Sequence, residues 1–238
     1  MAKLHDAWTV LPHGPLRELE TGLLTAVGQV PMPFGNFPRR MTVVGLPRRR
    51  TAIFSPVPLD PLSMERIETL GQPAYLIIPN GGHRLDARPF KARYPEAKVI
   101  TARGAKDKVA EAVPVDATDA RLGETAELIT VAGTNDRELA MLVRHDGGCS
   151  LITNDIIGHV RHPQGPGAWV MARLMGFGAS GPQIPRVVRR MFVTDPAALA
   201  AQLRAWAALP GLRRIVPSHG DVIDNPTVAL MRLAKSLD

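Results

Sequence analysis

The apolar residues of this 238-residue chain occur in short runs, which limits what it can fold into. The longest, such as residues 74–79 and 209–216, are brief or interrupted by arginine. None reaches the roughly 18 residues that a membrane span needs. Short apolar runs bounded by turn residues are typical of buried strands. We therefore expect a protein built on sheets and without a membrane-spanning helix.

Helix starts alternate with these strand-like runs. Asp60-Pro61, Asp195-Pro196 and Asn225-Pro226 each place a capping residue before a proline, a pattern that favours the first turn of a helix. We expect strands at residues 41–46, 51–57, 74–78, 98–101, 127–131, 139–145, 150–153 and 214–216, and a helix-like segment at 16–27. Two blocks of strands, each followed by helices, predict helices outside two packed sheets.

The domain organisation is expected to be simple. No repeat or low-complexity linker divides the sequence, so we predict a single domain over residues 1–238. Residues 1–40 are rich in proline and glycine and should form an irregular N-terminal arm that packs on this domain. The N-terminus has no apolar signal region, which predicts a cytoplasmic location. Cys149, the single cysteine, excludes an internal disulfide and a cysteine-only zinc cage, and should be a small buried apolar residue.

The net charge of +7 comes mainly from arginine, with clusters such as Arg48–Arg50. Such a surface attracts anions. However, Arg48–Arg50 lies between two strand-like runs and is typical of a solvated hairpin tip, and no aromatic residues alternate with the basic ones as a single-strand-binding groove requires. We expect neither a nucleic-acid nor a membrane partner, but a small-molecule substrate whose identity, like the oligomeric state, the sequence does not specify.

Three polar residues each follow a buried-strand pattern: His83, Asp155 and His219. Loops at strand ends converge in sheet-based folds, so these side chains can meet although they are far apart in sequence. Two imidazoles and a carboxylate are suitable ligands for zinc, iron or manganese. A purely structural role for each is the alternative. His159 and His162 follow Asp155 closely and can reach the same loop region.

Residues 176–181, Gly-Phe-Gly-Ala-Ser-Gly, match the dinucleotide-binding pattern by letters only. No strand is expected before them, and Pro182 and Pro185 follow where a helix should run. We therefore interpret this segment as a glycine-rich loop.

Several motifs occur in the order found in the metallo-β-lactamase superfamily, which the chain resembles over residues 8–235. They are Asn80-Gly-Gly-His83, Tyr94-Pro-Glu-Ala-Lys-Val-Ile, Leu151-Ile-Thr-Asn-Asp155 and Val216-Pro-Ser-His219-Gly-Asp221. The segments Pro38-Arg-Arg-Met-Thr-Val-Val and Phe54-Ser-Pro-Val-Pro-Leu-Asp60 resemble a narrower branch, known only as a domain of unknown function. The resemblance implies an α/β (α+β) fold, the αββα four-layer sandwich of the metallo-β-lactamases.

The resemblance also implies a degenerate set of metal ligands. His83, Asp155 and His219 match the ligands of the second metal position, and Asp155 and His219 would be the catalytic residues. The first position has lost its histidines: Ile78 and Asn80 stand where two of them belong. The remaining departures are Gly82 in place of an aspartate and Gly133-Thr-Asn-Asp136 in place of a Gly-His loop.

What the resemblance implies about function is a mononuclear metal-dependent hydrolase. The site would hold one divalent transition metal per chain, zinc or another, or it would hold none. A bound metal would supply hydroxide to attack an ester, amide, thioester or phosphoester. Asp86, Asn80 and Asp221 are candidate helpers of such a site. Two alternatives stay open, because a fold does not establish an activity. One is a non-catalytic binding protein with a vestigial metal site, and the other is a nucleic-acid processing protein.

Overall fold

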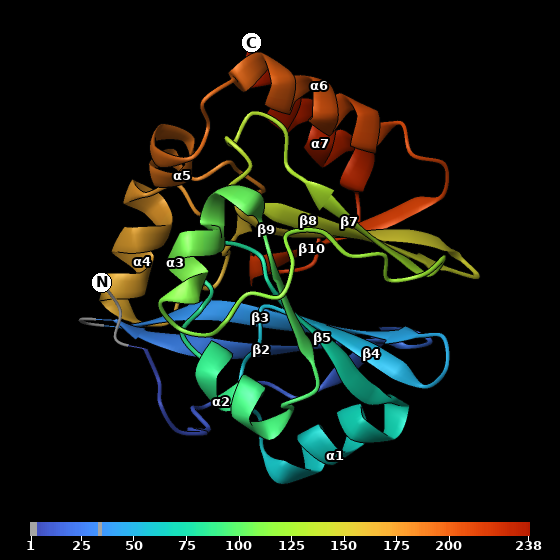
Figure 1. The fold of residues 1–238 in the computed structure, drawn as a ribbon. Coiled ribbons are helices and arrows are strands. Elements are labelled where there is room, and N and C mark those ends of the chain that lie inside the picture. The colour runs from blue at the N-terminus through green and yellow to red at the C-terminus, as the bar shows by residue number, and fades with distance from the viewer. Residues whose placement is uncertain (1–3, 33–34) are drawn as a thin grey trace. The chain divides into compact units, whose positions relative to one another are not determined.

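The computed structural model describes residues 4–32 and 35–238, which form two compact units (Figure 1). The first unit comprises residues up to Gln29 together with Arg39–Leu128, and the second comprises Val30–Pro38 and Ile129–Asp238. Each unit contains most of one sheet and has its own helices. A single domain over residues 1–238 stays a prediction.

The sheet that belongs mostly to the first unit has six strands in the order β1-β2-β3-β4-β5-β6, and its residues within Val30–Pro38 belong to the second unit. They are β1 (Arg17–Glu20), β2 (Leu23–Met32), β3 (Gly35–Leu46), β4 (Arg50–Phe54), β5 (Gln72–Ile78) and β6 (Lys98–Thr101). The β3/β4 pair is antiparallel, as the predicted hairpin requires, and β5 pairs in parallel with both β4 and β6. Leu76, Ile77 and Ile78 of β5 are fully buried, as expected for a strand covered on both faces.

The helix-like segment predicted at residues 16–27 is wrong, and so is the irregular arm for this part of the chain. Both strands β1 and β2 lie there, in antiparallel register. Gly22 has a φ of +77° and forms the turn between them, and its carbonyl accepts a hydrogen bond from the Gly45 amide. A glycine in this conformation starts a hairpin, while apolar spacing alone suggested a helix.

Three α-helices are described in the first unit: α1 (Pro61–Leu70), α2 (Ala87–Arg93) and α3 (Lys106–Ala110). The predicted start of α1 is confirmed, since the Asp60 carboxylate accepts a hydrogen bond from the Ser63 amide at 3.1 Å. Met64 and Ile67 form its buried face. Helices α1 and α2 both contact β5, which holds the strand end that precedes His83.

The second unit has a four-stranded sheet in the order β10-β9-β8-β7. Its strands are β7 (Ala126–Thr130), β8 (Leu139–His145), β9 (Gly148–His159) and β10 (Leu212–Gly220). Its helices are α4 (Gly165–Leu174), α5 (Arg186–Met191), α6 (Pro196–Ala207) and α7 (Pro226–Lys235). Helix α7 contacts β10 and α6, and residues such as Leu203, Ile215 and Leu230 fill the core between sheet and helices.

Strands β9 and β10 are longer than predicted, so Asp155 and His219 lie within strands and not after them. The parallel register of β9 and β10 is broken at this place. Thr153 pairs with Pro217, whereas Gly158 pairs with His219, so four residues of β9 (154–157) lie opposite the single residue Ser218. Such an irregularity re-aims side chains, and it sets the position of Asp155.

Two smaller predictions are confirmed. Cys149 is buried, with its Sγ 3.7 Å from the carbonyl oxygen of Pro210. Residues 176–181 form a loop between α4 and α5. In the two described stretches of the chain, no helix has both the length and the apolar character needed to cross a bilayer.

Candidate metal centre

His219 of β10 is held by a backbone carbonyl. Its Nδ1 lies 2.6 Å from the carbonyl oxygen of Pro38, in the same unit. Since a carbonyl oxygen only accepts, Nδ1 carries the hydrogen and donates it. The other ring nitrogen, Nε2, lies 3.0 Å from Oδ1 of Asp155. The imidazole is thus fixed at one nitrogen and directed at a carboxylate with the other.

Two aromatic side chains fix the plane of this imidazole. The ring centroid of Phe37 lies 5.0 Å from that of His219, and that of Phe177 lies 5.7 Å away in an edge-on arrangement. Phe37 and Phe177 also contact each other, with centroids 4.7 Å apart. His219 is buried, so its ring has little freedom to rotate away from Asp155.

The glycine-rich loop brings Phe177 to this position. Gly158 of β9 exchanges two backbone hydrogen bonds with Gln183, and the Val160 amide donates to the Phe177 carbonyl at 2.8 Å. Gly178 has a φ of +85°, and a Cβ there would lie 2.2 Å from the Gly158 carbonyl oxygen. The glycines therefore permit a close approach of loop and strand. Sequence reasoning identified the loop but not this role.

Asp155 and His219 present two hydrogen-bond acceptors to each other. With the hydrogen on Nδ1, a neutral His219 has only a lone pair at Nε2, and an ionised Asp155 has only lone pairs at Oδ1. At 3.0 Å this pair requires a cation at that position, either a proton or a metal ion. An imidazole that donates its other N–H to a backbone carbonyl is the usual arrangement for a metal-binding histidine. The donor set of the second unit therefore fits a metal ion.

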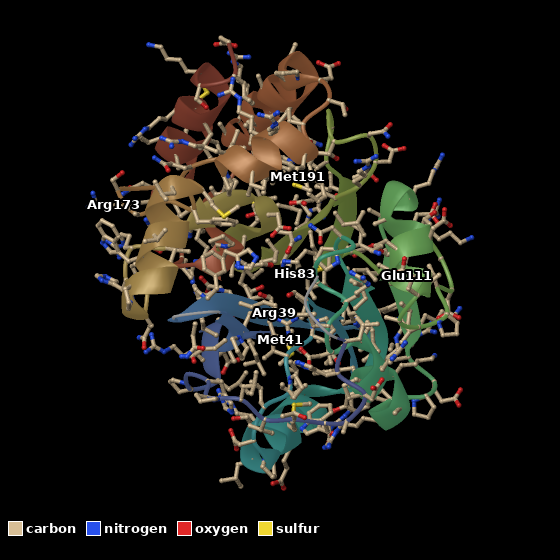
Figure 2. All side chains as sticks on the ribbon, turned by 90° about the vertical axis from the view of Figure 1, so that its left-hand side faces the viewer. Arg39, Met41, His83, Glu111, Arg173 and Met191 are labelled. Carbon is tan, nitrogen blue, oxygen red and sulfur yellow. The ribbon has the colours of Figure 1, made fainter. Side chains whose placement is uncertain are left out.

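His83 belongs to the first unit and follows β5, as predicted (Figure 2). It is buried, and its Nδ1 lies 2.7 Å from the Ser55 hydroxyl. Ser55 has a φ of +55°, an uncommon conformation for serine that places its hydroxyl on this imidazole. Asn80, at the start of the same turn, accepts a hydrogen bond from the Gly82 amide at 2.8 Å through its Oδ1.

The candidate helper Asp86 is engaged elsewhere in the first unit. Its carboxylate pairs with the buried Arg39 guanidinium and lies 2.6 Å from His5 Nδ1. The second helper, Asp221, pairs with Arg161 at 2.9 Å in the second unit. These contacts give both carboxylates a structural partner.

The remaining residues that the sequence singled out lie as follows. His159, at the end of β9, donates from Nδ1 to the Asp221 carbonyl at 3.1 Å, and burial lowers the pKa of its imidazole. His162 is exposed. In the loop that replaces the Gly-His motif, the Thr134 hydroxyl donates to the Val131 carbonyl at 2.6 Å.

Comparisons with known proteins support the fold. No family model and no curated protein matches the sequence, so the resemblance to a narrower branch stays a prediction. Solved structures do match over nearly the whole chain. The DIM-1 metallo-β-lactamase has a TM-score of 0.63 at 10% identity and covers 97% of this chain and 100% of its own.

Two further structures give the same result. The mono-zinc form of the FIM-1 metallo-β-lactamase from Pseudomonas aeruginosa has a TM-score of 0.61 at 12% identity, with coverage of 95% of this chain and 96% of its own. A metallo-β-lactamase from Erythrobacter litoralis has a TM-score of 0.60 at 16% identity, with coverage of 93% and 96%. The predicted fold class is thus confirmed, and the chain has the metallo-β-lactamase fold.

Proposed function

We propose that this chain is a mononuclear metal-dependent hydrolase whose ligands are Asp155, His219 and His83. The substrate class is an ester, amide, thioester or phosphoester of a small molecule. The observation that carries the proposal is the facing pair of acceptors, His219 Nε2 and Asp155 Oδ1, 3.0 Å apart, with His219 Nδ1 already donating to Pro38.

The choice of His83 as the third ligand rests on chemistry and on motif order. Two imidazoles and one carboxylate form a donor group that can hold a metal ion. The Ser55 hydroxyl beside His83 Nδ1 can accept the hydrogen of that nitrogen, which leaves Nε2 for a metal. Three protein ligands are the minimum for a catalytic site with open coordination positions.

Other residues of the protein would hold the ligands His219 and Asp155 in position. Phe37, Phe177 and the Pro38 carbonyl hold the His219 ring in one plane and one tautomer. The irregular register of β9 directs Asp155 toward His219. When bound, a divalent metal would supply Lewis acidity toward a carbonyl or phosphoryl oxygen. A zinc ion is our first choice, since imidazole and carboxylate are ligands that zinc commonly takes.

A specific observation also favours the alternative, a non-catalytic binding protein. A proton in place of a metal ion satisfies the same pair, because a doubly protonated His219 donates from Nε2 to the Asp155 carboxylate. In that case the pair is a structural ion pair. The two readings differ in how they respond to added metal.

The test compares unfolding of the chelator-treated protein with and without zinc. A metal that binds only the folded state at about 100 times its Kd raises the free energy of unfolding by about 2.7 kcal/mol. We expect this gain in the parent protein and in His162→Ala, whose exposed imidazole is not a proposed ligand. We expect no gain in His219→Ala or in His83→Ala.

The same variants are then assayed against a panel of esters, thioesters, lactams and phosphodiesters. The proposal predicts an activity in the zinc-loaded parent and in His162→Ala that both ligand variants lack. A parent protein that zinc does not stabilise, and that hydrolyses no member of the panel, would refute the hydrolase and favour the structural ion pair.

A further inference from the structure

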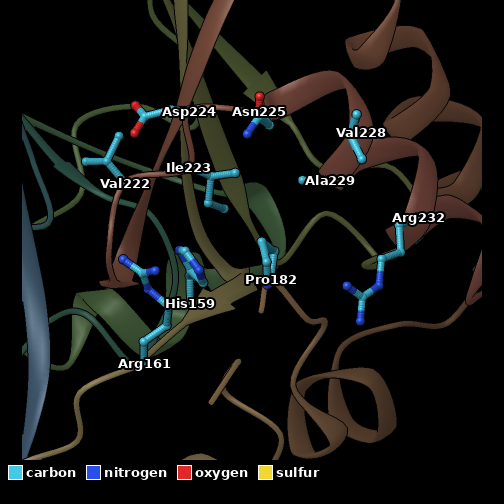
Figure 3. A pocket seen from close by; sticks show the side chains of 10 residues that line it. All are labelled: His159, Arg161, Pro182, Val222, Ile223, Asp224, Asn225, Val228, Ala229 and Arg232. Atoms are coloured by element: carbon cyan, nitrogen blue, oxygen red, sulfur yellow. The ribbon is translucent and has the colours of Figure 1, made fainter. Parts of the chain in front are cut away.

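A second site lies in the second unit, in a pocket of about 320 Å³ whose lining includes neither Asp155 nor His219 (Figure 3). This volume is at the small end of the range for ligand pockets. The walls come from the end of β9, the segment after β10, helix α7 and the loop before α5. The lining residues are His159, Arg161, Pro182, Val222, Ile223, Asp224, Asn225, Val228, Ala229 and Arg232.

Helix α7 presents one stripe of residues to the pocket. Asn225, Val228, Ala229 and Arg232 are spaced as neighbours along one helical face. Val228 and Ala229, with Pro182 and Ile223, make the middle of the pocket apolar. Val228 is exposed, and an apolar residue in this place offers contact area to a ligand. These apolar side chains lie between Asp224 on one side of the pocket and Arg232 on the other (Figure 3).

The imidazole of His159 offers an acceptor to the pocket. The residue is only 8% exposed, and its Nδ1 donates to the Asp221 carbonyl. In the neutral ring this leaves Nε2 as an acceptor, and among the described residues no hydrogen bond to it is formed. Nε2 is not among the buried atoms that lack a partner, so this side of the otherwise buried ring is accessible to a ligand that brings a hydroxyl or another donor.

The charges of the pocket are separated. Arg161 is paired with Asp221, whereas the Arg232 guanidinium has no ion pair or hydrogen bond with the residues that the structure describes. Figure 3 shows Arg232 and Asp224 on opposite sides of the pocket. The free guanidinium therefore defines one end as the place for an anion, and His159 and Asp224 define a region that accepts hydrogen bonds.

We propose that this pocket binds a small organic anion that carries a hydroxyl group at a distance from its acidic group. The carboxylate of the ligand pairs with Arg232, its compact apolar body lies against Ile223, Val228 and Pro182, and its hydroxyl donates to His159 Nε2. This site does not depend on a metal ion, so it can be tested separately from the hydrolase.

The probe is 4-hydroxybenzoate, which has a carboxylate and a hydroxyl at opposite ends of an apolar ring. Binding is measured by titration calorimetry, and the site is located from NMR shifts of the His159 side-chain nitrogens. Two analogues separate the contributions: benzoate lacks the hydroxyl, and 4-hydroxybenzamide lacks the charge. We expect each analogue to bind about 10-fold more weakly than 4-hydroxybenzoate, since each loses either the ion pair with Arg232 or the hydrogen bond to His159 Nε2.

The variants distinguish this pocket from general attraction of anions to a basic surface. Arg232→Gln should weaken 4-hydroxybenzoate about 10-fold and leave 4-hydroxybenzamide unchanged. Lys235→Gln is the matched control, because it removes the same charge from a position of the same helix that does not line the pocket. Both residues are exposed, so folding should be preserved.

Three results would overturn the proposal. These are no saturable binding of 4-hydroxybenzoate up to about 10 mM, equal losses in Arg232→Gln and Lys235→Gln, and His159 nitrogen shifts that do not move on saturation. Chelator treatment should not change the affinity, so this test is independent of the zinc experiments.

Discussion

Replacing Arg39 by methionine should lower the free energy of unfolding by about 3–5 kcal/mol. The side chains of Arg39 and Asp86 are 5% and 2% exposed, so their ion pair lies inside the first unit. Without the guanidinium, Asp86 keeps only His5 Nδ1 as an ionic partner, and a buried carboxylate loses most of its compensation. Arg39 Nε and Nη1 have no hydrogen-bond partner in the described chain, so the pair is costly to maintain.

The single change Asp86→Ala should cost a similar amount, because it leaves the Arg39 charge buried. The double variant Arg39→Met/Asp86→Ala should cost less than the sum of the two, by about 0.5–3 kcal/mol, since no charge is then left alone. Urea unfolding followed by circular dichroism measures all three. Arg66→Met is the control: its ion pair with Glu18 is exposed, so the loss should stay below about 1 kcal/mol. Strictly additive costs in the double variant would refute a buried, coupled pair.

Three further predictions concern other parts of the chain. Gly220→Ala should lower the free energy of unfolding in urea by about 2–5 kcal/mol. Gly220 has a φ of +103°, and a Cβ there would lie 2.0 Å from the His159 carbonyl oxygen. Gly14→Ala is the control and should be nearly neutral. Burial lowers the pKa of His159 in the folded state, so the unfolded state binds the proton first when the pH is lowered. The free energy of unfolding therefore decreases as the pH falls below about 6.5. His159→Gln should therefore lose less stability between pH 7.5 and pH 5 than the parent, and equal losses would contradict this. Binding to nucleic acid should be weak and vanish near physiological salt, and tight binding at about 0.2 M salt would support the nucleic-acid processing alternative.

Local signals predicted much of the fold. The Asp60-Pro61 and Asp195-Pro196 helix starts both place a carboxylate on a first-turn amide. The β3/β4 hairpin around Arg48–Arg50 was equally clear, since apolar alternation and turn residues agree there. The helix predicted at residues 16–27 was wrong for a physical reason. The spacing of the leucines there is compatible with a helix or with strands, and the positive φ of Gly22 produces a turn between two strands.

Of the candidate site, only the ligands could be predicted from the sequence. His83, Asp155 and His219 could be named from strand ends and motif order, but β9 and β10 continue past the expected ends. The contacts that hold His219, the Pro38 carbonyl and Phe177, are distant in sequence and carry no pattern of their own. Long-range contacts of this kind depend on tertiary packing, which periodicity does not encode.

The metal content of the purified protein tests the central claim most directly. Protein incubated with zinc and then desalted should retain about one metal ion per chain by elemental analysis, removable by a chelator. His219→Ala and Asp155→Asn should retain none, and His162→Ala should match the parent. Two tightly held ions per chain would contradict the loss of the first metal position at Ile78 and Asn80, and retention of zinc by the His219→Ala variant equal to that of the parent would contradict the site itself.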